Sequence, residues 1–361
     1  MLHLPQHRAF RSGVMMRAAA ALALCVLLGG CGNLTYYLQS VGGQLDIWNR
    51  EVPIERLLED PALEPKLRVQ LERALRIRQY ASRELALPDN RSYRAYADLA
   101  RPFVVWNVFA TPEFSIEPRQ WCFLVAGCVN YRGYFDETGA RAYAQQMVAA
   151  GNDVYIGGVP AYSTIGWFAD PVLNTFIHYP EAELARLLFH ELAHQVVYVK
   201  DDTVFNESFA TVVEQAGVAR WLAAYGSEED RRRYAALQRY REDFRALVAK
   251  TRAELAVLYA GPESADAKRR RKAEVFAALK EDYQLRRKEW SGFSGYDRWF
   301  AQPLGNAHLA AVAVYTQQVP AFRALLERNG NELPRFYAAV RELADLPAAE
   351  RSARLAALAS R

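Results

Sequence analysis

The sequence predicts an α+β fold that is predominantly helical, and three features support this prediction. Residues 64–87 and almost everything beyond residue 181 carry apolar residues at helical spacing. Short runs of β-branched and aromatic residues, bounded by Pro, Gly and Asn, lie within residues 103–158 and predict strands. The chain has 361 residues, of which 51% are hydrophobic and 24% are charged. These proportions exclude a disordered, collagen-like or disulfide-scaffold protein.

The first thirty residues predict a secretory signal peptide. They contain Arg8, Arg11 and Arg17 but no acidic residue, and an apolar run of about thirteen residues follows Arg17. That run is too short for a permanent membrane-spanning helix, which needs roughly 20 residues. Leu28-Gly29-Gly30-Cys31 is similar to a bacterial lipobox, in which the cysteine becomes the lipidated first residue. An ordinary signal peptide followed by an incidental cysteine is the alternative.

We therefore expect a lipid anchor at Cys31 that holds the protein on the bacterial envelope. Gly32 follows the cysteine, where an Asp usually retains such lipoproteins in the inner membrane. This favours the outer membrane, with the mature chain facing the oxidising periplasm. Cys122 and Cys128 are then the two cysteines left in the mature chain with an unmodified thiol. They form either a local disulfide or two small buried hydrophobic residues.

The net charge of the mature chain argues against a nucleic-acid partner. Removing Arg8, Arg11 and Arg17 from the 45 basic residues leaves 42, against 41 acidic residues. A nearly neutral chain has no excess positive charge with which to attract DNA or RNA.

The elements between residues 64 and 158 follow from local patterns. We expect a helix over residues 64–87, strands over residues 103–109, 121–125 and 153–158, and a helix over residues 138–150. The last of these helices ends at Gly151, because glycine commonly terminates helices.

Two long charged stretches, residues 228–259 and 264–289, predict an antiparallel helical hairpin. We interpret residues 226–290 as an insertion in a single domain that covers residues 31–361. The hairpin could contact protein partners in the envelope. Its basic run, residues 268–272, lies beside many acidic residues and is interpreted as a solvated helix face, with a nucleic-acid or lipid-headgroup patch as the alternative.

The chemistry is predicted by the segment Leu188-Phe-His-Glu-Leu-Ala-His-Gln195. A helix over residues 181–197 places His190 and His194 one turn apart on the same face, so both imidazoles can bind one metal ion. Glu191 lies beside the first ligand and reaches a water on the ion. Zinc lowers the pKa of such a water to about 7, and the carboxylate can then accept its proton.

A third ligand is predicted downstream. A catalytic zinc ion needs three protein ligands and an open fourth position, and two histidines with one glutamate form a known set. Glu207, in Asn206-Glu-Ser-Phe-Ala210, is expected in the first turn of the next helix. Glu214 lies two turns further along the same face, where it can accept the remaining N–H of a ligating imidazole. We expect one Zn²⁺ ion.

These motifs resemble those of the gluzincin peptidases, notably the zinc aminopeptidases that carry H-E-x-x-H and a downstream N-E-x-F-A. The resemblance implies a zincin-like, thermolysin-type core with a small β-sheet and an active-site helix. Together with Trp121-Cys122, residues 131–136 and residues 162–171, they also resemble a family of bacterial lipoproteins described as predicted aminopeptidases. That likeness covers most of residues 31–340.

Substrate-binding residues are predicted from the segment before the active-site helix, where zincins have an edge strand that lines the cleft. An exposed edge can pair with an extended peptide. Tyr162, Ser163, Thr164 and Gly166 are therefore expected to bind substrate, and an ordinary turn with aromatic core residues is the alternative. Tyr315 is nominated to stabilise the oxyanion, with a core or surface tyrosine as the alternative.

An aminopeptidase also has to bind the α-ammonium group of its substrate. The G-x-M-E-N type segment that does so in the known enzymes is absent from this sequence, and Asp170 and Glu183 are candidates to replace it. His178 and His308 are interpreted as structural residues.

The sequence thus predicts a lipid-anchored zinc peptidase of the periplasm that acts on peptides, as an aminopeptidase rather than an endopeptidase. An endopeptidase that degrades misfolded envelope proteins is one alternative. A non-catalytic assembly or binding lipoprotein, which retains the zinc fold only as a scaffold, is the other.

Overall fold

The computed structural model describes residues 35–359 except 124–126 and 315–316. Helices predominate, as the sequence predicts, and the strands are few and short. The chain divides into two compact units, residues 1–49 and residues 50–361. The described part of the first unit is helical, and this helix continues to residue 50. None of the described helices is both long and apolar enough to cross a membrane.

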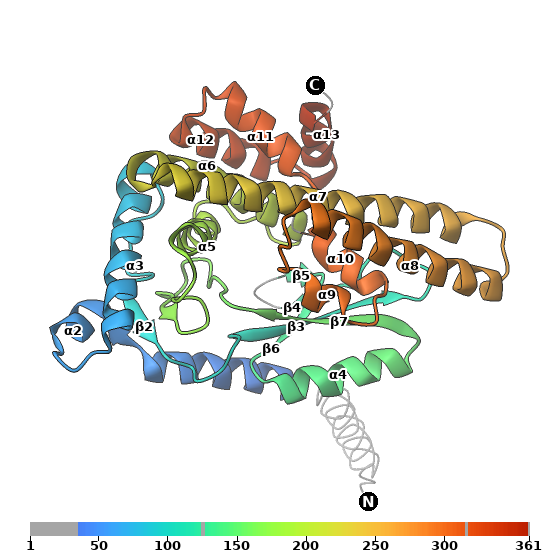
Figure 1. Ribbon diagram of the computed structural model, residues 1–361, viewed down its shortest axis with the longest axis horizontal. Helices are drawn as coiled ribbons and strands as arrows, with labels where there is room; N and C mark the ends of the chain where they lie inside the picture. Colours follow the sequence, from blue (N-terminus) through green and yellow to red (C-terminus); the bar gives the residue numbers. More distant parts are fainter. Residues whose placement is uncertain (1–34, 124–126, 315–316, 360–361) are drawn as a thin grey trace, which may run out of the picture. The chain divides into compact units, whose positions relative to one another are not determined.

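The main sheet of the second unit has the strand order β6-β3-β7, with β3 antiparallel to both neighbours. Helix α4 packs against β3 and β7 on one face, and α10 packs against them on the other (Figure 1). The strands predicted within residues 103–158 are confirmed at β3, β4 and β7. The bounds are β3 Val105–Pro112, β4 Trp121–Phe123, β5 Gly127–Val129, β6 Arg132–Tyr134, β7 Asn152–Val159, α4 Glu137–Ala149 and α10 Asn306–Val314.

Smaller elements complete the described strands. Strand β2 pairs antiparallel with β1 and parallel with β8, and β4 pairs with β5. Within the β4–β5 hairpin, Cys122 and Cys128 form a disulfide. This is the first of the two alternatives that the sequence left open. The bounds are β1 Val52–Pro53, β2 Ala95–Ala97 and β8 Val172–Leu173.

Helices α5 and α6 form the centre of the second unit. The two helices pack against each other, and Phe189 on α5 is fully buried. On α6, Phe205 and Phe209 are buried against Phe322, which lies further along the chain. Gly217 allows the two helices to approach closely, because a Cβ atom at this position would lie 2.7 Å from Cδ2 of Phe189. Helix α3 packs against α5. The bounds are α2 Ile54–Glu59, α3 Pro65–Glu84, α5 Glu181–Ala193 and α6 Thr203–Tyr225.

The predicted helical hairpin is present as α7 (Glu228–Ala260) and α8 (Ala265–Glu289), which run side by side (Figure 1). Ser227 and Ser264 cap the two helices by accepting hydrogen bonds from backbone N–H groups of the first turn. A cluster of buried aromatic and aliphatic residues, including Phe244, Tyr283 and Trp290, fills the hairpin and joins it to α10. The remaining helices are α9 Asp297–Phe300, α11 Val319–Arg328, α12 Leu333–Ala344 and α13 Ala348–Ala359.

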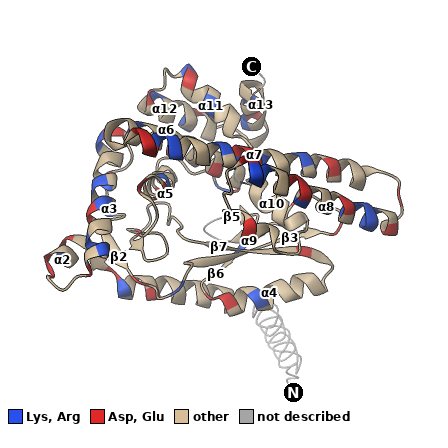
Figure 2. Cartoon of the chain, viewed as in Figure 1, with Lys and Arg blue, Asp and Glu red and all other residues tan. Residues whose placement is uncertain are grey.

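Acidic and basic residues are interspersed along the hairpin (Figure 2). Within the basic run 268–272, Arg269 pairs with Glu113 and Asp266, and Nζ of Lys272 lies 2.6 Å from Asp153. These ion pairs agree with the interpretation of this run as a charge-compensated helix face.

Candidate metal centre

His190 and His194 lie at the C-terminal end of α5. His190 is in the last turn, and His194 is the residue that caps the helix, with helical dihedral angles. The centroids of the two rings are 4.9 Å apart. The helix is shorter than the predicted range 181–197, because the N–H groups of Gln195 and Val196 bond to carbonyls three residues back and tighten the chain into a turn. The one-turn spacing of the two histidines is preserved nevertheless.

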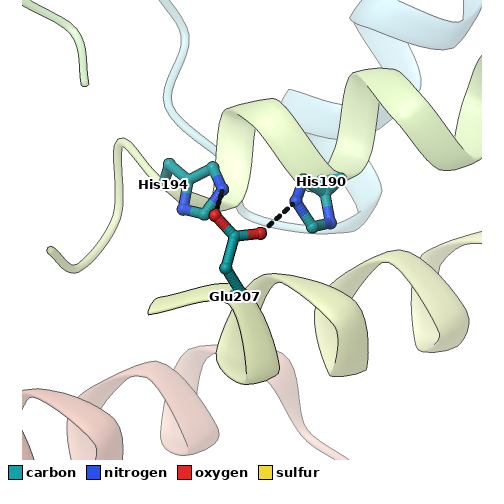
Figure 3. A group of neighbouring side chains, drawn as sticks. All are labelled: His190, His194 and Glu207. Atoms are coloured by element: carbon teal, nitrogen blue, oxygen red, sulfur yellow. Dashed lines mark hydrogen bonds and ion pairs between the residues drawn. The ribbon is translucent and has the colours of Figure 1, made fainter. Parts of the chain in front are cut away.

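Glu207 lies on α6 and faces both histidines (Figure 3). Its Oε2 atom is 3.2 Å from Nε2 of His190, and its Oε1 atom is 3.8 Å from Nε2 of His194. The prediction that Glu207 belongs to the first turn of its helix is wrong. The side chain of Asp202 accepts a hydrogen bond from the N–H of Phe205, so α6 begins at Thr203 and Glu207 falls in the second turn.

The arrangement of these three side chains fits a single tetrahedral metal ion. Their ligand atoms all lie within 4.8 Å of one another. Two ligands at typical zinc bond lengths are about 3.4 Å apart across a tetrahedral angle, close to the 3.2 and 3.8 Å observed. Burial lowers the pKa of His194 to about 4, so this imidazole is neutral at neutral pH and can donate a lone pair. The donor set of two imidazoles and one carboxylate is one that zinc accepts.

The electrostatics of the metal-free site depend on two carboxylates. Burial by itself lowers the pKa of His190, but the hydrogen bonds with Glu207 and Glu214 outweigh burial and raise the pKa to about 10. Burial raises the pKa of Glu207, but the two histidines outweigh it and hold the pKa below its ordinary value. In the absence of metal, a proton therefore occupies His190 between two anions, in the place where a cation would bind.

Glu191 is buried next to this cluster, with only 8% of its surface exposed. Burial, which is the largest effect, raises the pKa of its carboxyl group to about 7, and the nearby charge of Glu207 acts in the same direction. A carboxylate with a pKa near neutral pH is suited to accept and return a proton.

Glu214 contacts His190 on the side of the ring away from Glu207. Its Oε2 atom lies 3.0 Å from Nδ1 of His190 and 3.0 Å from Nη1 of Arg186. Burial raises the pKa of Glu214, but Arg186 and His190 outweigh it and lower the pKa to about 2, so the group is an anion. The predicted contact between Glu214 and one of the two imidazoles, that of His190, is present in the structure.

The predicted substrate-binding residues lie in a loop and not on the edge strand, which corrects the expectation from the sequence. β7 ends at Val159, because Pro160 has no N–H group to continue the ladder. Ser163 and Thr164 instead direct an Oγ and an N–H group toward the carboxylate of Asp170. The loop contains all four predicted residues, Tyr162, Ser163, Thr164 and Gly166. A Cβ atom added at Gly166 would lie 3.7 Å from Cγ of Gln195, the residue after His194.

Other predicted residues lie away from this cluster or outside the described part of the chain. Tyr315 and Cys31 both lie outside the described residues. His178 is exposed, whereas His308 is buried and its Nδ1 accepts a hydrogen bond from the N–H of Gly305. The ring of His308 packs on Tyr155, and burial lowers its pKa to about 4.

Two residues that contribute to this centre were missed at the sequence level. Arg186 bonds to Glu214, and Arg241 of α7 bonds to Glu183. The spacing of Glu183, Arg186 and His190 on α5 was an available signal, because residues three and seven positions apart share a helix face. No local signal pointed to Arg241, which lies on another helix 51 residues after His190.

Comparison with known proteins identifies the family but no individual relative. No curated protein and no solved structure matches the chain. A family model described as "Putative aminopeptidase" matches residues 35–355, which include the whole metal centre and the helical hairpin. A match over most of the chain means that this protein belongs to that aminopeptidase family.

Proposed function

We propose that the protein is a zinc-dependent peptidase of the aminopeptidase type. The observation that carries this proposal is the convergence of His190, His194 and Glu207 from two helices beside the buried carboxyl group of Glu191. Membership of the aminopeptidase family supports peptidase activity in general.

In this proposal each residue has one role. When bound by His190, His194 and Glu207, zinc supplies a Lewis acid that acidifies water and polarises the scissile carbonyl. Glu191 accepts the proton of the attacking water on its carboxylate and returns it to the leaving amine. Glu214 accepts the N–H at Nδ1 of His190 and so fixes which ring nitrogen faces the metal.

The decisive experiment replaces the proton carrier and leaves the ligands in place. Glu191→Gln should bind one equivalent of zinc, as the wild type does, and should lose peptide hydrolysis by at least about 100-fold, as is typical for loss of a general base. Glu84→Gln removes an exposed carboxylate of α3 and serves as the matched control. Wild-type turnover in Glu191→Gln would refute the mechanism.

The aminopeptidase part of the proposal requires an anion for the substrate's ammonium group, and Asp170 is the better of the two candidates. Glu183 is already bonded to Arg186 and Arg241. No ion pair between Asp170 and a cation occurs within the described part of the chain, and the charge of Asp170 acts on both Glu191 and Glu51. Burial raises the pKa of Asp170 to about 6, so it is mostly ionised at neutral pH.

The test compares peptides that differ only at the amino terminus. Free-amine peptides should be cleaved and N-acetylated peptides should not, and Asp170→Asn should raise KM for the free-amine peptide about tenfold or more. Equal cleavage of acetylated and free peptides would instead identify an endopeptidase.

We further propose that the mature chain is anchored to the outer membrane through Cys31 and faces the periplasm. The lipobox-like segment and Gly32 support this proposal. Cys31→Ser should move the protein from the membrane fraction to the soluble fraction of the periplasm. Retention of this variant in the membrane fraction would refute the lipid anchor.

A further inference from the structure

A chain of charged side chains connects the candidate metal ligand His190 to the helical hairpin. Oε2 of Glu214 contacts Nδ1 of His190 at 3.0 Å and accepts a hydrogen bond from Nη1 of Arg186 at 3.0 Å. Nε of Arg186 donates to Oε2 of Glu183 at 3.0 Å, and Nη2 of Arg241 donates to the same oxygen at 2.6 Å. We name these four residues, Glu214, Arg186, Glu183 and Arg241, the ion-pair chain. It starts on α6, crosses α5 and ends on α7.

The ion-pair chain is largely shielded from solvent. The side chains of Glu214 and Glu183 are 5% and 13% exposed, and those of Arg241 and Arg186 are 22% and 25% exposed. Near its outer end, Oε1 of Glu183, Nη1 of Arg241 and the hydroxyl of Tyr234 are buried without a hydrogen-bond partner among the described residues. The attraction between two charges is larger where water is excluded, and removal of one partner from a shielded pair leaves a costly uncompensated charge.

The order of the charges determines how each residue of the ion-pair chain affects its neighbours. Positive and negative charges alternate, so Arg186 is held between two carboxylates and Glu183 is held between two guanidinium groups. Without Arg241, the ion-pair partner left to Glu183 among the residues that the structure describes would be Arg186, and Glu183 would compete with Glu214 for it. The contact between Glu214 and His190 would then lose part of its support.

We propose that Arg241 of α7 is a positioning residue of the metal centre, which acts through Glu183, Arg186 and Glu214 to fix the ring of His190. This inference rests on the proposed metal site. It also assigns the hairpin a role in metal binding, apart from any contact with envelope partners.

Removal of Arg241 separates positioning from simple electrostatics, because the two effects have opposite signs. Loss of a cation makes the site more negative, and a more negative site binds a divalent cation more tightly. Loss of positioning instead frees the imidazole and weakens binding. Substitution of residues that directly support a metal ligand typically costs 10–100-fold in metal affinity, and Arg241 lies further along the same chain of contacts.

The experiment measures the affinity of the full-length protein for Zn²⁺ alone, by competition with a chromophoric chelator. Arg241→Met should weaken Zn²⁺ binding about threefold to tenfold, and Arg241→Lys, which keeps the charge, should recover part of the loss. Arg233→Met removes an exposed arginine of the same helix and should leave the affinity unchanged. The visible absorption of bound Co²⁺ should change in Arg241→Met, because it reports ligand geometry.

A double-mutant cycle tests whether Arg241 acts through Glu183. Glu183→Gln should also weaken Zn²⁺ binding, and the double variant should be little worse than either single variant, because both break the same contact. Arg241→Lys keeps the test decisive if Arg241→Met does not fold, because the charge is unchanged and weaker Zn²⁺ binding would then report lost positioning. Unchanged or tighter Zn²⁺ binding in the folded Arg241 and Glu183 variants would overturn the inference alone. Failure of the wild type to bind Zn²⁺ would overturn the proposed function itself.

Discussion

The carboxylate of Glu214 lies 3.0 Å from Nδ1 of His190, on the side of the imidazole opposite to Glu207. This contact assigns the two ring nitrogens different tasks. A carboxylate that accepts the N–H at Nδ1 leaves Nε2 to face Glu207. Without metal Nε2 carries the N–H that bonds to Glu207, and in the proposed site its lone pair is directed at the metal. Arg186 also bonds to this carboxylate, so His190 and Arg186 together fix the position of its Oε2 atom.

We therefore expect Glu214→Gln to weaken zinc binding by about 10–100-fold while the three ligands remain in place. The amide can offer an N–H group to His190, which favours the wrong tautomer of the ring. Chelator competition measures the loss, and Glu342→Gln, on α12, is a suitable control. An affinity equal to that of the wild type would mean that the contact does not orient the ligand.

Metal content provides a direct test of the ligand set. Protein purified without chelator should contain about one zinc ion per chain, since three protein ligands and an open position define a catalytic zinc site. His194→Ala and Glu207→Ala should each lose most of this metal, as measured by elemental analysis. His178→Ala should retain it, because His178 is exposed and is not part of the three-residue cluster. A zinc content that does not depend on His194 would place the metal elsewhere.

The pH dependence of stability should reveal Glu191 in the metal-free protein. Burial raises its pKa to about 7 in the folded state, so the folded state binds the proton more tightly than the unfolded state. The resulting stabilisation is fully present below about pH 4.5 and is lost as the pH rises through about 7.

Glu191→Gln removes this dependence. The unfolding free energy of the variant, relative to that of the wild type, should rise by about 2.5 kcal/mol between pH 5 and pH 8, because one pKa unit corresponds to about 1.4 kcal/mol and part of the loss occurs below pH 5. Urea denaturation at the two pH values, without metal, measures the difference. If the two proteins lose stability in parallel over this range, Glu191 does not titrate near neutral pH.

Local patterns predicted those parts of the site that depend on local geometry. His190 and His194 are four residues apart on one helix, and that spacing alone brings their rings together. The strands in residues 103–158, the helical hairpin and the contact between Glu214 and His190 were likewise predicted from spacing and composition.

Features that depend on tertiary packing or on a single capping residue were not predicted. Arg241 reaches Glu183 only because the tertiary fold brings this part of α7 close to the first turn of α5. Asp202 shifts the start of α6, so Glu207 falls one turn later than expected. Pro160 ends β7, and the segment expected to continue the edge strand folds into a loop around Asp170.

The close approach of α5 and α6 at Gly217 makes the geometry of the metal centre sensitive to a single methyl group. A Cβ atom there would lie 2.7 Å from Cδ2 of Phe189 and 2.8 Å from Cδ1 of Leu85. Both side chains are fully buried, so neither can move aside without disturbing the core. Phe189 directly precedes His190 in the sequence.

We expect Gly217→Ala to destabilise the protein by about 1–2 kcal/mol and to weaken zinc binding. Overpacking costs roughly 1–3 kcal/mol, and the better helix propensity of alanine offsets at most about 1 kcal/mol. Gly42→Ala is the matched control, because Gly42 is also helical but has no atom within 4 Å of an added Cβ. This control should be neutral or slightly stabilised in thermal unfolding. If Gly217→Ala also gained stability, the two helices would not be in close contact at Gly217, and the separation between Glu207 and His190 would not depend on this contact.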